Sequence, residues 1–143
     1  MNIDTPLVVQ SIYSSKLTTD DPTYSYGGCD LSNYYYEVIQ VNIMKSGYYT
    51  LVSNSSVNTY GRLYKDNFNP FSPSTNLILG DDNSCANYQF KISLELTVNT
   101  TYILVVTTHS PNVTGAFSVI VSGFNNVSFQ LLSEYLYCLC KPL

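Results

Sequence analysis

The stretch that decides the fold is YYYEVIQVNIMKSGYYTL, residues 34–51, in which apolar residues occupy every second position on both sides of a short turn. Nearly the same pattern returns 53 residues later as NYQFKISLELTVNTTYIL, residues 87–104, so that Ile39 aligns with Ile92. Successive side chains of a strand point to opposite faces, and each copy therefore predicts two strands with one buried face. We interpret the copies as two related hairpins that belong to two sheets packed face to face.

The remainder of the chain also predicts short strands separated by turn residues. The expected strands are residues 12–18, 34–43, 48–53, 60–64, 76–79, 88–96, 101–107 and 116–122. This spacing indicates an all-β fold, a jelly-roll-like antiparallel β-sandwich of about seven to nine strands. The expected core consists of Ile39, Val41, Ile43, Leu51, Ile92, Leu94, Leu96, Leu104 and Val119. Only the segment from Phe129 onward shows a weak helical period.

Composition excludes several classes of function. Charged residues make up 11% of the 143 residues, against about 25% in typical globular domains. The net charge is −4 and the six basic residues are scattered, so we expect no nucleic-acid partner. No apolar run approaches the roughly 18 residues that a membrane span requires. The N-terminal MNIDTPLVVQSIY shows no pattern of a secretory leader.

Four Asn-x-Ser/Thr sequons are candidates for N-glycosylation, although chance alone accounts for a similar number. Their asparagines fall at predicted turns or strand ends, where a glycan projects without disturbing a core. Low charge and abundant hydroxyl groups are also typical of secreted β-proteins. We therefore expect an extracellular or cell-surface location, with glycans on Asn54, Asn99, Asn112 and Asn126.

Several motifs resemble the pre-peptidase C-terminal family, small jelly-roll sandwiches appended to secreted hydrolases. They are SKLTTDDPTY, the long stretch that begins YYYEVIQV, LGDDNSCANYQF and GAFSVIVSG. A Gly-x-Tyr-x-Leu strand of that family matches Gly47, Tyr49 and Leu51, whereas Asn58 replaces its usual aspartate and Thr100 its second glycine. The chain is more similar still to tandem modules of large extracellular invertebrate proteins. The resemblance supports the fold far better than any function.

The resemblance divides the chain into three parts. Residues 14–123 form the module, preceded by an apolar segment, 1–13, and followed by an apolar tail with two cysteines, 124–143. Exposed apolar segments are normally covered, and strand addition to a neighbour is one way to cover them. We expect the terminal segments either to dock on another module or subunit, or to fold back on their own sandwich as a strand or helix.

The cysteines allow one disulfide and show no zinc pattern. Cys29 and Cys85 precede the two matching strands, in loops that can emerge at the same end of a sandwich, so a bond between them is one expectation and two free thiols the other. Cys138 and Cys140 are too close in sequence to bond without strain. With one histidine and no C-x-x-C pair, the chain lacks a zinc pattern.

Residues for catalysis are scarce, and we expect no enzyme activity. His109, the one histidine, has no nucleophile motif around it, and we expect an exposed loop residue whose replacement by alanine leaves folding unchanged. The adjacent carboxylates at positions 20–21 and 81–82 point apart, unlike a hydrolytic pair that faces across a substrate.

Two binding chemistries stay open. Asp81, Asp82 and Asn83 offer hard oxygens within three residues, as calcium prefers, and Asp66, Asn67 and Asn69 could add others; solvated turns explain the same residues. Some relatives in the resembled family hold calcium and bind collagen in this way. Tyrosine rings stack on sugars, which raises a polysaccharide-binding surface on Tyr24, Tyr26, Tyr34, Tyr35, Tyr36, Tyr60 and Tyr64.

These observations favour a non-catalytic structural or adhesive module of an extracellular array or self-associating fibre. Its partners would be neighbouring modules, a matrix protein or a polysaccharide. The alternative is a calcium- or sugar-dependent accessory module that delivers a secreted hydrolase to a polymer. The sequence names no required cofactor.

Overall fold

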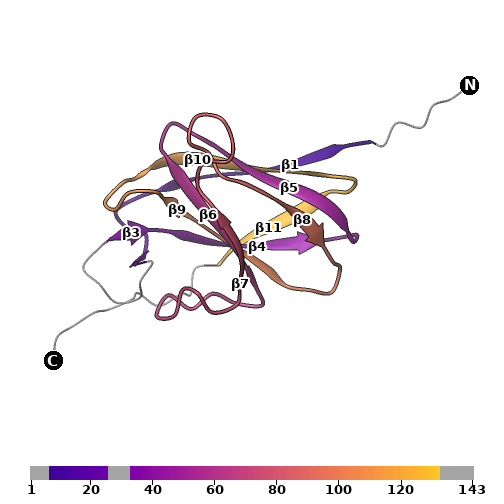
Figure 1. The fold of residues 1–143 in the computed structure, drawn as a ribbon, viewed down its shortest axis with the longest axis horizontal. Coiled ribbons are helices and arrows are strands. Elements are labelled where there is room, and N and C mark those ends of the chain that lie inside the picture. Colours follow the sequence, from indigo (N-terminus) through magenta and orange to yellow (C-terminus); the bar gives the residue numbers. More distant parts are fainter. Residues whose placement is uncertain (1–6, 26–32, 133–143) are drawn as a thin grey trace, which may run out of the picture.

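The computed structural model describes residues 7–25 and 33–132, which fold into two antiparallel sheets packed face to face (Figure 1). The four-stranded sheet has the order β1-β10-β5-β8 and the five-stranded sheet β11-β4-β9-β6-β7. Their strands are β1 (Val9–Leu17), β10 (Gly115–Gly123), β5 (Gly47–Ser55), β8 (Lys91–Leu96), β11 (Val127–Leu132), β4 (Glu37–Ile43), β9 (Tyr102–Thr108), β6 (Thr59–Lys65) and β7 (Leu77–Asp81). A two-residue pair, β2 (Thr23–Tyr24) and β3 (Tyr34–Tyr35), lies outside the two sheets. The expected all-β sandwich is confirmed.

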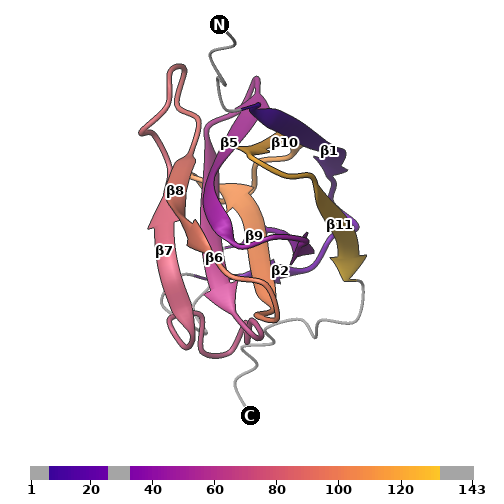
Figure 2. The ribbon, with the colours of Figure 1, turned by 90° about the vertical axis from the view of Figure 1, so that its right-hand side faces the viewer.

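The strand order is that of a jelly roll. When β11 and the β2–β3 pair are left out and the remaining eight strands are renumbered 1 to 8 in chain order, the two sheets have the orders 1-8-3-6 and 2-7-4-5. This is the arrangement made by curling one long antiparallel ribbon. Figure 2 views the molecule along its longest axis, with β6 and β7 running along the plane of the picture. The described residues contain no helix. Phe129 lies in β11, and the rest of the segment with the weak helical period, residues 133–143, lies outside the described part.

The two matching sequence segments are not hairpins. β4 and β5 belong to different sheets, as do β8 and β9, because the short turns between them carry the chain across the sandwich. Instead β4 pairs with β9 and β5 with β8. Ile39 lies opposite Leu104 in one sheet, and Leu51 lies opposite Ile92 in the other. These two pairs correspond under the 53-residue offset, because Ile39 aligns with Ile92 and Leu51 with Leu104. The two copies of the repeat, β4 with β5 and β8 with β9, are therefore the two arms of one antiparallel ribbon, and they pair in the same register in both sheets.

The core between the sheets contains the residues that alternation predicted. Eight of the nine expected core residues are buried, and Leu94 is partly buried against them. Aromatic rings complete the packing, and two glycines leave room for them. A Cβ atom on Gly61 would lie 2.7 Å from the ring of Phe90, and one on Gly123 would lie 2.3 Å from the ring of Tyr49.

A second cluster of buried side chains covers the outer face of the five-stranded sheet. Tyr24 and Tyr36 come from the region of β2 and β3, and Phe68 from the loop after β6. The ring centroids of Tyr24 and Phe68 are 5.4 Å apart, with the rings edge to face. The cluster consists of Tyr24, Tyr36, Val38, Tyr64, Phe68, Ile103 and Val105. The outer face of the other sheet carries no such cover among the described residues.

Both ends of the described chain extend the sandwich past residues 14–123. β1 begins at Val9 and pairs with β10 along its whole length. β11, within the expected C-terminal tail, pairs with β4, and the Val127 amide donates to the Ser11 hydroxyl at 3.1 Å. Residues 127–132 thus fold back on their own sandwich, one of the two expected outcomes, while residues 133–143 lie outside the described part.

Candidate functional site

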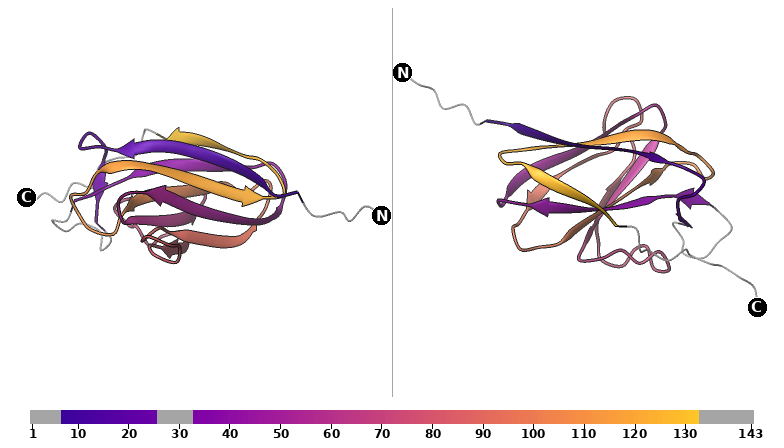
Figure 3. Two further views of the ribbon diagram at one scale, coloured as in Figure 1. Left: turned by 90° about the horizontal axis from the view of Figure 1, so that it is seen from above. Right: turned by 180° about the vertical axis from the view of Figure 1, so that it is seen from behind.

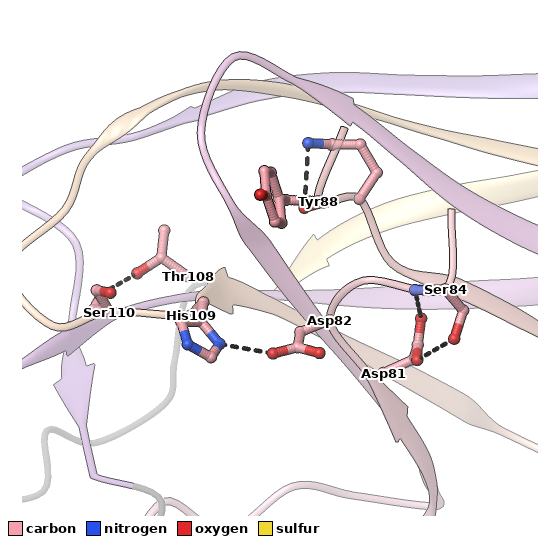
Figure 4. Close-up of polar contacts among 8 residues, drawn as sticks. Asp81, Asp82, Ser84, Tyr88, Thr108, His109 and Ser110 are labelled. Atoms are coloured by element: carbon pink, nitrogen blue, oxygen red, sulfur yellow. Dashed lines mark hydrogen bonds and ion pairs between the residues drawn. The ribbon is translucent and has the colours of Figure 1, made fainter. Parts of the chain in front are cut away.

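Asp81 joins the edges of the two sheets at the end of β7. Its Oδ1 accepts a hydrogen bond from the Ser84 hydroxyl at 2.6 Å, and its Oδ2 accepts from the Ser84 amide at 3.1 Å (Figure 4). The same Oδ2 accepts from the amide of Lys91, the first residue of β8, at 2.8 Å. The carboxylate therefore stabilises the turn after β7 and connects it to the edge strand of the opposite sheet.

Asp82 and His109 come together from two different loops. The Nδ1 atom of His109 lies 2.6 Å from Oδ2 of Asp82, and Figure 4 shows the imidazole facing the carboxylate. The His109 amide donates to the Asn58 carbonyl at 2.9 Å, which fixes the loop after β9. The His109 side chain is 54% exposed and that of Asp82 24%. Sequence reasoning missed this pair because the two residues are 27 positions apart.

The expected calcium ligands are thus engaged by protein groups. Asp81 and Asp82 accept the hydrogen bonds described above, and the side chain of Asn83 is exposed. In the second loop, Asn67 Oδ1 accepts from Asn76 and Asn69 Oδ1 from the Phe71 amide. Within residues 7–25 and 33–132, no three His, Cys, Asp or Glu side chains are grouped to hold a metal ion. These hydrogen bonds are what solvated turns would form, and calcium binding stays a prediction.

The expected disulfide involves a residue outside the described part of the chain. Cys85 is half-buried and forms no disulfide with another described residue, and its amide donates to the Gln89 carbonyl at 3.0 Å. Cys29, Cys138 and Cys140 fall outside the described residues. The Cys29–Cys85 bond therefore stays a prediction.

The tyrosines do not form the exposed surface expected for stacking on a polysaccharide. Tyr24, Tyr36 and Tyr64 are at most 2% exposed, because the second cluster encloses them. The Tyr64 hydroxyl donates to the Pro73 carbonyl, and burial raises the pKa of Tyr64 to about 12. Tyr34, Tyr35 and Tyr60 are partly exposed, and Tyr26 lies outside the described residues. The prediction that Tyr24 and Tyr64 contribute to an exposed platform was wrong.

All four sequon asparagines are exposed, in two kinds of setting. Asn54 lies near the end of β5, on the outer face of the four-stranded sheet. Asn99 and Asn112 occupy turns in the left-handed region, with φ of 69° and 62°, and Asn126 directly precedes β11. Each setting leaves room for a glycan.

A shallow pocket opens beside Asn54 on the uncovered sheet. Its volume is about 350 Å³, and its lining comes from β1, β5 and β10. Ser14 and Ser118 lie next to each other in it, with hydroxyl oxygens 2.8 Å apart. None of the described lining residues is charged. Sequence reasoning missed the pocket because its hydroxyl groups come from three separated strands and form no local motif.

Glu37 is a buried carboxylate between the sheets. It is 6% exposed and accepts hydrogen bonds from the Tyr13 hydroxyl at 2.8 Å and the Ser15 hydroxyl at 2.6 Å, both from β1. Burial, which disfavours charge, raises the pKa of Glu37, although these hydrogen bonds oppose the shift. Burial also raises the pKa of Tyr13 to about 12. The group links β1 to β4 across the sandwich.

Comparisons with known proteins assign no family to this architecture. No family model matches the chain, and a search of curated proteins finds no match either. No helix of the described residues is long and apolar enough to cross a membrane.

Proposed function

We propose that the chain is a non-catalytic, extracellular structural or adhesive module that works in a repeat array or a self-associating fibre. The observation that carries the proposal is the direction of the first and last described strands. β1 and β11 run the same way along the sandwich, which is visible in both views of Figure 3. The described chain therefore enters at one end of the sandwich, and its last strand is directed toward the other end.

The contacts of β1 and β11 fix this polarity. The start of β11 lies beside the start of β1, because Val127 bonds Ser11. The end of β11 lies farther along β1, because Leu132 pairs with Val38, next to the Glu37 that Tyr13 and Ser15 reach from β1. Nine residues of extended β1 span about 30 Å. Modules connected through opposite ends form an extended array rather than a folded-back pair.

Strand β7 offers a surface for self-association. It lies at the edge of the five-stranded sheet, and its neighbouring apolar residues Ile78 and Leu79 are 42% and 40% exposed. An exposed edge strand with apolar side chains is a template for strand addition. The opposite sheet ends in β8, whose exposed Lys91 and Glu95 disfavour the same pairing. Of these two neighbouring edges, β7 is the one that we propose for the addition of a second copy.

Small-angle X-ray scattering of two full chains joined in tandem tests the array geometry. We expect a rod with a maximum dimension near twice that of one chain. A compact particle whose maximum dimension stays near that of one chain contradicts the proposal.

Sedimentation equilibrium of the full chain tests self-association. We expect concentration-dependent association that Ile78→Lys weakens at least tenfold, because the lysine charge would be buried at the added strand. Met44→Lys, at a turn residue that is 65% exposed, is the matched control and should leave association unchanged. A monomer with hydrolase activity overturns the proposal.

The alternative, a calcium- or sugar-dependent accessory module of a secreted hydrolase, is favoured by one observation, the open serine-lined pocket. Titration with calcium and with neutral oligosaccharides, followed by thermal unfolding, distinguishes the two. An accessory module gains stability with saturating ligand, as linkage requires.

A further inference from the structure

We infer that the pocket beside Asn54 is the seat of the first sugar of a glycan attached to Asn54, and that this sugar covers the apolar centre of the uncovered sheet. The inference rests on the proposed function, because N-glycans are added only to chains that enter the secretory pathway. The sequon alone indicates only that Asn54 can carry a glycan, whereas the inference also says where its first sugar binds and that this sugar covers the sheet.

The register of the strands places the attachment point at the pocket. Ser14 pairs with Ser118, and Ser118 pairs with Asn54, so the three residues form one row across β1, β10 and β5. Paired residues in a sheet share a face, and Asn54 and Ser14 are exposed. Figure 3 (left) looks onto this face, where the strands lie side by side. A sugar on the Asn54 amide needs only to lie along its own row to reach both serines.

The chemistry of the lining suits a neutral, hydroxyl-rich ligand. Each serine hydroxyl both donates and accepts hydrogen bonds, as sugar hydroxyls do. The lining includes Ser14, Ser55, Ser56 and Ser118, and none of its described residues is charged. A volume of about 350 Å³ lies at the small end of ligand pockets and suits one sugar ring rather than a whole glycan.

The adjacent row supplies an apolar surface for the rest of the sugar. Ile12 pairs with Ile120, and Ile120 with Val52, two residues along each strand from the serine row. Ile12 is 60% exposed, although it lies in the middle of an edge strand. Exposed apolar patches on a sheet are normally covered. The methyl group and C–H face of an N-acetylglucosamine would cover this row while its hydroxyls bond to the serines.

The other three sequons lack this arrangement. Asn99, Asn112 and Asn126 lie in turns outside the strands, so their glycans project into solvent. The chain therefore contains its own controls, with one sequon on a sheet face and three on turns.

The test uses the full chain made in a eukaryotic secretory host, with site occupancy read by mass spectrometry. We expect Asn54→Gln to lower the Tm by about 3 °C, the shift that roughly 1 kcal/mol produces in a domain of this size. Asn126→Gln, at an exposed sequon residue outside the left-handed region, should remove its glycan with no comparable change. Trimming every glycan to its first sugar should leave the Asn54 contribution intact, because only that sugar fills the pocket.

Two further measurements address the seat itself. Replacing the two serines of the Asn54 row, as Ser14→Ala with Ser118→Ala, should abolish the Tm difference between glycosylated and unglycosylated protein without changing occupancy. Nuclear Overhauser contacts should join the acetamide methyl of the sugar to the Ile120 methyls.

The contradicting outcomes are distinct. An occupied Asn54 whose loss lowers the Tm no more than loss of Asn126 overturns the inference, as does an unoccupied Asn54 beside occupied turn sequons. A rise in Tm when free N-acetylglucosamine is added to protein that carries a glycan on Asn54 shows that the glycan leaves the pocket empty, and likewise overturns it. Failure of self-association alone bears on the proposed function and leaves this site untouched.

Discussion

Strands β5 and β9 occupy equivalent places in the sequence repeat but have different surroundings. On the inner side they match, because Tyr49 and Leu51 of β5 and the corresponding Tyr102 and Leu104 of β9 all lie in the core. On the outer side they differ. β5 alternates between buried and exposed positions, whereas every residue of β9 is buried.

The difference comes from segments that the repeat does not contain. Ile103 and Val105 of β9 pack beneath Tyr24, Tyr36 and Phe68 of the second cluster. The corresponding outer residues of β5, Thr50 and Val52, have no such cover in the described part of the chain. The repeat thus specifies the inner core, and the connecting segments decide which outer face is buried.

The largest expected effect is on the cover of β9. Phe68→Ala should lower the free energy of unfolding by about 3–5 kcal/mol, because it removes a buried ring and leaves a cavity. Phe71→Ala, in the same loop but at a residue 47% exposed, should cost below about 1 kcal/mol. Urea unfolding measures both. Equal costs would show that the second cluster is not a core.

The next effect compares two valines at matched positions of the repeat. Val105→Ala should cost about 2 kcal/mol, because Val105 is fully buried and two methyl groups are lost. Val52→Ala should cost below about 1 kcal/mol, since its side chain is half-buried on the uncovered face. The pair is measured by urea unfolding of the unglycosylated protein. A larger loss of unfolding free energy for Val52→Ala than for Val105→Ala would contradict the conclusion that only the outer face of β9 is buried.

The inner faces, by contrast, should respond alike. The Tyr49 hydroxyl donates to the Lys45 carbonyl at 2.6 Å, and the Tyr102 hydroxyl accepts from the Thr97 amide at 2.9 Å. Each bond anchors the turn that precedes its strand, so Tyr49→Phe and Tyr102→Phe should each cost about 1 kcal/mol. Thermal unfolding checks whether the costs agree. A difference above about 2 kcal/mol would mean that the two arms are not equivalent.

The smallest effect appears where the repeat itself is broken, since Glu37 stands at the position that Phe90 holds in the other copy. Because burial raises the pKa of Glu37, the folded state favours the neutral acid, and ionisation costs stability as the pH rises through that value. Wild type should therefore lose stability relative to Glu37→Gln as the pH rises above about 4.3, the ordinary pKa of a glutamate side chain. Glu95→Gln, at an exposed residue, is the control. If the stability difference between wild type and Glu37→Gln stays constant with pH, the pKa of Glu37 is not raised in the folded state.

Alternation predicted the parts of this fold that are local. It located β4, β5, β8 and β9 and the inner core around Ile39 and Leu104, because a two-residue period records which face is buried. It did not predict which strands pair, since a turn after β4 can return along the same sheet or cross to the other. The crossing depends on contacts between residues far apart in sequence, such as Ile39 with Leu104.

The candidate sites depend on the same distant contacts. Asp82 and His109 meet only because β7 and β9 finish at the same end of the five-stranded sheet. The second cluster forms only where a loop folds over β9. The sequons could be found from sequence alone, but their settings could not. Asn54 and Asn99 carry the same motif, and only the pairing of β5 with β10 places one of them on an open sheet.

The pairing of β1 with β10 also constrains how the chain folds as it is made. Val9 lies opposite Gly123, so the partner of the first strand is synthesised more than a hundred residues later. At about 5–20 residues per second, β1 waits roughly 5–25 s for a place in a sheet. Such distant contacts fold slowly, because the entropy of closing the chain is lost before the contacts form. During that interval the alternating apolar strands stay unpaired, so recovery of folded protein should depend more on the rate of synthesis and on chaperones than on final stability.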